Sequence, residues 1–100
     1  MRLIGQTRMF MTQRKDIDTM RRKRDIDGLI GALSDQEEVI RLTAAEALGS
    51  VGDERAIEPL EHLKFTDPDA NVRRAASLAH ARVVARLAEK KGVEGWLLDR

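Results

Sequence analysis

Apolar residues along this chain recur at the spacing of an amphipathic helix, and no stretch of six residues alternates apolar and polar positions as a strand would. The clearest stretch predicts a helix over residues 37–51. Its apolar positions fall at i, i+4, i+7, i+8 and i+11, which is one face of a helix with 3.6 residues per turn. They are Ile40, Ala44, Ala47, Leu48 and Val51. Gly52 is expected to close this helix in the left-handed conformation.

The start of this helix is marked twice. Ser34 and Glu37 have the spacing of a capping box, in which a side chain accepts a hydrogen bond from an N–H group of the first turn. Asp35 and Glu38 have the same spacing. After the helix, Asp53 is placed to cap the next one.

Three further helices are predicted over residues 25–33, 54–64 and 69–88, and a short one over residues 16–23. Their inward positions, in chain order, are Ile17 and Met20; Ile26, Leu29, Ile30 and Leu33; Ile57, Leu60 and Leu63; and Val72, Ala76, Ala79, Val83 and Leu87. The chain is therefore expected to be helical throughout.

The two prolines sharpen these boundaries. Pro59 lies inside the helix predicted over residues 54–64 and is expected to kink it, because proline lacks the N–H of the i→i−4 hydrogen bond. Asp67 followed by Pro68 predicts the start of the helix over residues 69–88, with Asp67 as N-cap and Pro68 at the first helical position.

The chain repeats itself. The stretch VIRLTAAEALGSVGDERAIEPL of residues 39–60 has an echo, VRRAASLAHARVV, that begins at residue 72. Short and long helices alternate, so each unit is a helix hairpin whose apolar face a neighbouring hairpin must cover. The predicted organisation is one all-α domain with units at residues 25–53 and 54–88, a basic N-terminal segment (1–24) with a short capping helix, and a C-terminal tail or cap (89–100).

The hairpin unit resembles the HEAT repeat, in the short form also known from phycobilisome lyases. In that family a proline in the first helix is followed eight residues later by aspartate and six beyond that by arginine, and Pro59, Asp67 and Arg73 have this spacing. The preceding unit has Asp35 and Arg41 at the matching positions. The resemblance implies a short right-handed α-solenoid of about two HEAT-like hairpins with capping segments at both ends.

In this picture each aspartate caps its own long helix, and each arginine can reach the aspartate of the adjacent unit. We expect a ladder of ion pairs between Asp35 or Asp67 and Arg73. These motif residues, together with Arg41 and Pro59, are interpreted as structural.

Composition excludes several classes of protein. A chain of 100 residues suits one small domain, and the absence of cysteine excludes disulfides and thiolate metal sites. The N-terminal segment lacks the apolar run of an export signal, and no apolar stretch approaches the ~20 residues that span a bilayer. A cytoplasmic protein without a membrane partner is expected.

Charge is distributed unevenly. Residues 1–24 carry eight Lys or Arg against two Asp, whereas residues 25–100 have a net charge of −5. The basic cluster offers contacts for nucleic acid or another polyanion through Arg14, Lys15, Arg21, Arg22, Lys23 and Arg24. Because no aromatic residues interleave it to stack on bases, we prefer the alternative that these residues solvate a short helix or pair with acidic groups of the body.

No catalytic, metal or cofactor-binding site is predicted. His62 and His80, the two histidines, are not spaced to present two metal ligands on one helix face. The di-iron hydroxylases built from similar repeats carry His-Glu directly after the position of Arg41. Here Leu42-Thr43 follows Arg41 and Arg74-Ala75 follows Arg73, so we do not expect that activity. An accessory subunit of a lyase-like enzyme is an alternative that rests on the resemblance alone.

The remaining candidate site is the surface of the long helices, which line the concave face of a solenoid. Their outward positions are Glu38, Leu42 and Glu46 on one helix and Arg74, Leu78 and Arg82 on the next. Leu42 and Leu78, flanked by charges, are candidate contacts for a partner protein. Trp96 is expected to act as a cap or an interface residue, in a homodimer or with another protein. The sequence thus favours a non-enzymatic interaction scaffold or adaptor.

Overall fold

The computed structural model describes the backbone of residues 14–98 and the side chains of residues 16–90. The helices are α2 (Arg14–Lys23), α3 (Ile26–Ala32), α4 (Glu38–Val51), α5 (Ile57–Thr66) and α6 (Ala70–Leu98), with the 3₁₀ turn η1 (Glu54–Ala56) before α5. No strand lies among these residues, which confirms the all-α prediction. No helix in this range is both long and apolar enough to cross a membrane.

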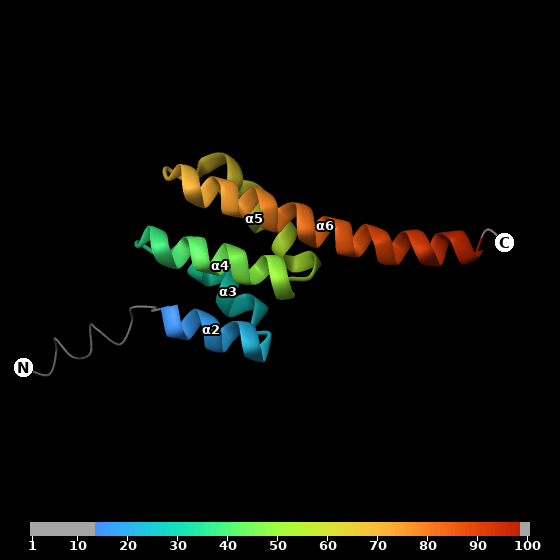
Figure 1. Cartoon of the computed structure of the whole chain (residues 1–100), viewed down its shortest axis with the longest axis horizontal. Helices are drawn as coiled ribbons and strands as arrows, with labels where there is room; N and C mark the ends of the chain where they lie inside the picture. Colours follow the sequence, from blue (N-terminus) through green and yellow to red (C-terminus); the bar gives the residue numbers. More distant parts are fainter. Residues whose placement is uncertain (1–13, 99–100) are drawn as a thin grey trace, which may run out of the picture.

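The helices form a stack of two layers (Figure 1). Helices α2, α4 and α6 run side by side, and α4 contacts both of its neighbours. Helices α3 and α5 lie behind them, each against the long helix that follows it in the chain. This is the arrangement of a short helical-repeat solenoid, with hairpins α3–α4 and α5–α6 and with α2 placed as the second helix of a preceding hairpin would be.

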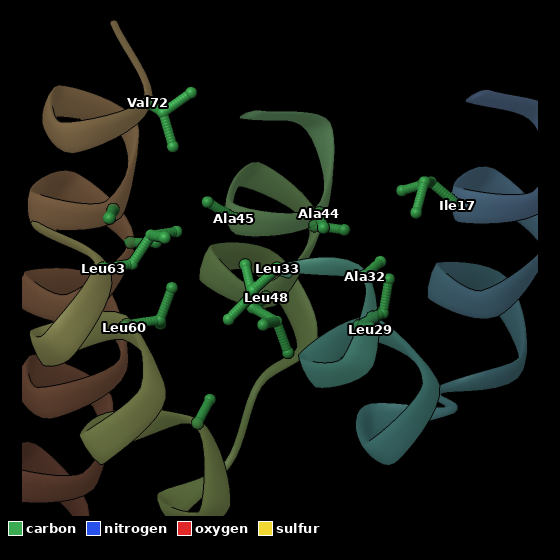
Figure 2. Packing of buried hydrophobic residues seen from close by; sticks show 14 of the residues in the cluster. Ile17, Leu29, Ala32, Leu33, Ala44, Ala45, Leu48, Leu60, Leu63 and Val72 are labelled. Atoms are coloured by element: carbon green, nitrogen blue, oxygen red, sulfur yellow. The ribbon is translucent and has the colours of Figure 1, made fainter. Parts of the chain in front are cut away.

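One hydrophobic cluster runs through the whole stack. It includes side chains from every helix, among them Ile17, Leu29, Leu48, Leu60 and Val72 (Figure 2). Much of it is alanine, so the helices pack closely. At Gly49 of α4, for instance, an added Cβ would lie only 3.2 Å from the Cα of Ala79 in α6. The small residues of the repeated phrase therefore set the distance between successive hairpins.

The start of α6 differs from the prediction. Asp69, not Asp67, caps this helix, because its carboxylate accepts a hydrogen bond from the N–H of Val72 at 3.0 Å. The helix begins at Ala70, beyond Pro68. Asp67 is instead buried beneath the turn, where its carboxylate accepts from the N–H of Asp69 at 2.9 Å. The N-cap prediction was wrong because this carboxylate is used for a contact between hairpins, described below.

Helix α6 is also longer than its predicted end near Leu87, since it continues to Leu98. Its C-terminal part extends past the other helices (Figure 1). The segment predicted as a tail or cap is therefore helical as far as Leu98, and the side chains of Trp96 and its neighbours lie outside the described residues.

The ends of α4 also correct the sequence prediction. No side chain caps the N-terminus at Glu37, and Asp35 instead accepts from the N–H of Glu37 at 2.9 Å, in the turn before the helix. Gly52 ends the helix in extended backbone (φ −67°), not in the left-handed conformation. Glycine is needed there for space, because a Cβ would come within 2.4 Å of the carbonyl oxygen of Leu48. Asp53 caps η1 as predicted, accepting from the N–H of Arg55.

Pro59 does not kink a continuous helix. The predicted helix over residues 54–64 is divided into η1 and α5, and α5 begins at Ile57. Pro59 is thus the third residue of α5, within the first turn, where an N–H has no partner in the helix and proline is tolerated. The interruption lies at the junction of Ala56 and Ile57.

Candidate functional site

Helices α2, α4 and α6 together present two shallow adjacent grooves, and we call this surface the groove face. The groove between α2 and α4 has a volume of about 300 Å³ and is lined by Ile17, Asp18, Arg21, Thr43, Glu46, Ala47 and Ser50. The groove between α4 and α6 has a volume of about 220 Å³ and is lined by Glu46, Gly49, Ser50, Ala75, Leu78, Ala79 and Arg82. Glu46 and Ser50 line both, so the two grooves lie on either side of these two residues of α4.

The groove between α4 and α6 exists because glycine and alanine occupy both facing helix surfaces. Longer side chains stand at its sides, namely Glu46, Leu78 and Arg82. The side chain of Leu78 is 55% exposed, which makes it a large apolar group available to a partner. The structure therefore brings three of the candidate contact residues to one groove.

Two of the three other candidate contacts lie away from this groove. Leu42 is half-buried, packs against the core and lines neither groove. Arg74 is exposed near the start of α6, where its guanidinium donates a hydrogen bond to the side-chain oxygen of Asn71 at 3.0 Å. The side chain of Trp96 lies outside the described residues.

Charges of both signs line the groove between α2 and α4. Asp18 accepts a hydrogen bond from Arg21 at 2.6 Å, and a guanidinium nitrogen of Arg22 lies 3.4 Å from the same carboxylate. The hydrogen bond from Arg21 lowers the pKa of Asp18 below its ordinary value; partial desolvation opposes this effect and the charge of Arg22 adds to it. Asp18 therefore remains ionised at neutral pH and offsets part of the positive charge of α2.

The basic cluster is thus partly engaged within the molecule. Arg21 and Arg22 pair with Asp18, whereas Lys23 and Arg24 are exposed at the end of α2. The side chains of the other two members, Arg14 and Lys15, lie outside the described residues. Binding of a polyanion through this cluster stays a prediction.

The ion pair between hairpins forms through Arg41, which reaches the aspartate of the adjacent unit as expected for a repeat arginine, although Arg73 was the arginine named for this pairing. The Nε of Arg41 donates to Oδ1 of Asp67 at 2.7 Å and its Nη2 to Oδ2 at 3.3 Å. The pair is buried, with side-chain exposures of 13% and 2%. Arg73 reaches Asp67 only through the backbone carbonyl, at 2.6 Å, and the carboxylate of Asp35 pairs with neither arginine. The pairing expected for Arg73 was wrong, because the Asp67 carboxylate is held by the arginine of the preceding hairpin.

A second exposed apolar group was missed by the sequence analysis. Phe65, in the last turn of α5, is 72% exposed and lies beside an open depression of about 410 Å³ with Glu58, Glu61 and His62. The ammonium group of Lys64 lies 5.2 Å from the centroid of its ring. The exposure of Phe65 could have been predicted from the sequence, because this residue falls outside the apolar stripe of α5.

The described side chains offer no group of three or more His, Cys, Asp or Glu that could hold a metal ion. His62 and His80 lie on different helices, α5 and α6. The groove face provides polar and apolar contacts, and it lacks a paired nucleophile and base among the residues that line it.

Comparison with known proteins gives two matches. The family profile of HEAT repeats matches residues 15–83. A deoxyhypusine hydroxylase from Candida glabrata is 44% identical to this chain over 48 residues, which make up 48% of this chain and 15% of the relative. The chain therefore covers only a small part of that relative's length. No solved structure matches the chain.

Proposed function

Since the chain belongs to the HEAT-repeat family, we propose that it is a non-enzymatic scaffold or adaptor that binds a segment of another protein along the groove face. Repeats of this kind stack into extended surfaces on which a partner lies across several helices. The proposal concerns the face formed by α2, α4 and α6.

The observation that carries the proposal is the position of Leu78. This leucine is 55% exposed at the side of a groove whose surface is otherwise made of small residues, with Glu46 and Arg82 beside it. An apolar anchor with charges of both signs around it suits an amphipathic peptide that has one apolar side and a polar edge. Isolated exposed leucines are common, so the groove beside Leu78 is what distinguishes it.

The residues that follow the repeat arginines support a non-enzymatic role. Leu42-Thr43 follows Arg41 and Arg74-Ala75 follows Arg73, where the resembling hydroxylases have His-Glu. The similarity to deoxyhypusine hydroxylase covers 15% of that protein, so it supports a shared repeat and is no argument for a shared activity. Turnover of a deoxyhypusine substrate by the purified chain would contradict this part of the proposal.

The direct test is selection of binding peptides from a displayed random library on the immobilised chain, followed by fluorescence anisotropy with each selected peptide. We expect Leu78→Asp to weaken binding at least about tenfold, because it places a charge at the apolar anchor. Ser77→Asp is the matched control, since Ser77 is the exposed neighbour of Leu78 on α6 and lines neither groove.

A selection without binders, or peptides that bind both variants equally, would exclude the groove face as the site. Light scattering on the unmodified chain adds one further distinction. A dimer that Leu78→Asp dissociates would identify the partner as a second copy of this chain.

A further inference from the structure

The two hairpins share one hydrogen bond, from the repeat arginine to a backbone carbonyl six residues upstream. The Nη1 group of Arg41 donates to the backbone carbonyl of Asp35 at 2.9 Å, and the Nη1 group of Arg73 donates to that of Asp67 at 2.6 Å. In both cases the carbonyl belongs to the aspartate six residues upstream. This shared contact aligns α4 with α6, position by position.

On α4, the side that faces the next hairpin is covered by that hairpin. Ala45 and Leu48 have no exposed surface, and Ala45 points toward α6 whereas Ala44 points toward α2 (Figure 2). Arg41 lies on the same side and donates its Nε and Nη2 to the carboxylate of Asp67. Together these groups form the surface on which the following hairpin packs.

On α6, the aligned side is open. Ser77 and His80 correspond to Ala45 and Leu48, and they are exposed and half-buried respectively. Val84, which corresponds to Gly52, is 38% exposed. Within the described part of the chain, Nε and Nη2 of Arg73 have no hydrogen-bond partner, although the same two groups of Arg41 hold a carboxylate.

The described chain cannot close this surface itself. Helix α4 ends at Val51 and the chain turns back at Gly52, whereas α6 runs straight through the matching Val84 to Leu98 (Figure 1). A second copy of α6 is also a poor occupant. The sequence of α6 contains four arginines and two lysines against two glutamates, so two such helices would bring like charges together. An occupant that repeats the interface between α4 and α6 would supply a carboxylate opposite Arg73, as Asp67 does opposite Arg41.

We propose that the open side of α6 docks a HEAT-type helix hairpin of a partner protein, whose aspartate before its second helix receives Arg73 as Asp67 receives Arg41. The surface continues the interface already formed between α4 and α6, and its charge matches that aspartate. It is separate from the groove face, so the two proposals stand or fall independently.

The test uses this chain's own second hairpin as the probe and joins it covalently to α6 after residue 83, which gives it a high local concentration. We call this fusion the extended chain. In it, residues 1–83 are followed by residues 52–98, so that Gly52 takes the place of Val84 and the added hairpin carries a second Asp67. We expect a single urea transition with a larger m-value than in the parent, because the added hairpin buries new surface. A separate second transition would overturn the proposal.

The role of Arg73 is measured by the same experiment. Replacement of the first Arg73 by Gln is expected to lower the urea midpoint at least twice as much in the extended chain as in the parent. Replacement of the added, second Asp67 by Asn should abolish that difference. Arg74→Gln is the control, because Arg74 pairs with Asn71 on its own helix, and should act equally in both chains. Equal effects of Arg73→Gln in both chains would also overturn the proposal.

A labelling readout covers the case in which the extended chain folds without a clear transition. The protein has no cysteine, so Ser77→Cys introduces one thiol on the open side of α6. In the extended chain only the first Ser77 is changed. We expect its reaction with a maleimide to be at least about tenfold slower in the extended chain, whereas Ser50→Cys on the groove face should react equally in both. An unprotected thiol at position 77 would contradict docking.

Discussion

At the scale of single residues, Arg24 stands out because its backbone has a positive φ of 55°, which no other non-glycine residue in the described range has. The N–H of Arg24 bonds to the carbonyl of Arg21, and the N–H of Asp25 bonds to the carbonyl of Met20 at 2.8 Å. These are the two hydrogen bonds of a Schellman closure, whose left-handed position normally belongs to glycine. A side chain there is strained, so α2 ends at some cost in stability.

Arg24→Gly is therefore expected to stabilise the protein by about 0.5–1 kcal/mol, as the relief of strain exceeds the extra flexibility of the unfolded chain. Urea unfolding of the two proteins measures this difference. Lys23→Gly, one residue earlier and within the helix, should lower stability by up to about 1 kcal/mol. If Arg24→Gly lowers stability as well, the strain at this turn does not exist.

At the scale of the elements, the C-terminus of α4 is held by a residue of α6. Nη1 of Arg86 donates to the carbonyl of Gly49 and Nη2 to that of Gly52, each at 2.7 Å. The last carbonyls of a helix lack partners within it and carry the negative end of its dipole, so a guanidinium there is doubly favourable. The end of α4 is thus fixed by the hairpin that follows.

Arg86→Ala should lower the free energy of unfolding by about 2 kcal/mol, because it removes charge-assisted hydrogen bonds and leaves carbonyls unpaired. Arg82→Ala, one turn earlier on the same helix, is the matched control and is expected to change stability by less than about 0.5 kcal/mol. Chemical denaturation of both variants checks the difference. Equal losses would mean that the two arginines act only through their charge.

At the scale of the whole molecule, the hairpins are joined by a continuous core and by one buried ion pair. Asp67 is the buried charged residue of the described chain, and its partner Arg41 comes from the preceding hairpin, 26 residues away. Arg41 also donates to the carbonyls of Asp35 and Gln36, so it ties the turn of one hairpin to the turn of the next. Removing one member of such a pair leaves an uncompensated charge.

Asp67→Asn is expected to lower stability by about 3 kcal/mol while unfolding stays a single transition, because both hairpins share the joint. The control is Asp53→Asn, which keeps the cap of η1 and removes the charge from an exposed pair with Arg55. We expect it to lower the free energy of unfolding by less than about 1 kcal/mol. Thermal melts followed by circular dichroism compare the two. A loss no larger than that of the control would show that the pair does not couple the hairpins.

Part of the candidate site could be predicted from the sequence. Helix phase places Glu46, Leu78 and Arg82 on outward positions, and the structure puts them around one groove. Phase could not show that Leu42 packs against the core, because that depends on where neighbouring helices lie. The exposure of Phe65 follows from the α5 stripe and was overlooked, while the capping role of Arg86 joins residues 34 and 37 positions apart and has no local signal.

The sequence by itself determined the helices and their stacking, because a 3.6-residue apolar period is a local property and a half-apolar hairpin must be covered by a neighbour. Only the tertiary structure decided how each polar group was used. One carboxylate such as Asp67 can satisfy its own turn, a helix N-terminus or a distant guanidinium, and the choice depends on what the fold brings within about 3 Å. The same reason explains why the open side of α6, where Nε and Nη2 of Arg73 have no partner among the described residues, emerges only once α4 and α6 are seen in register.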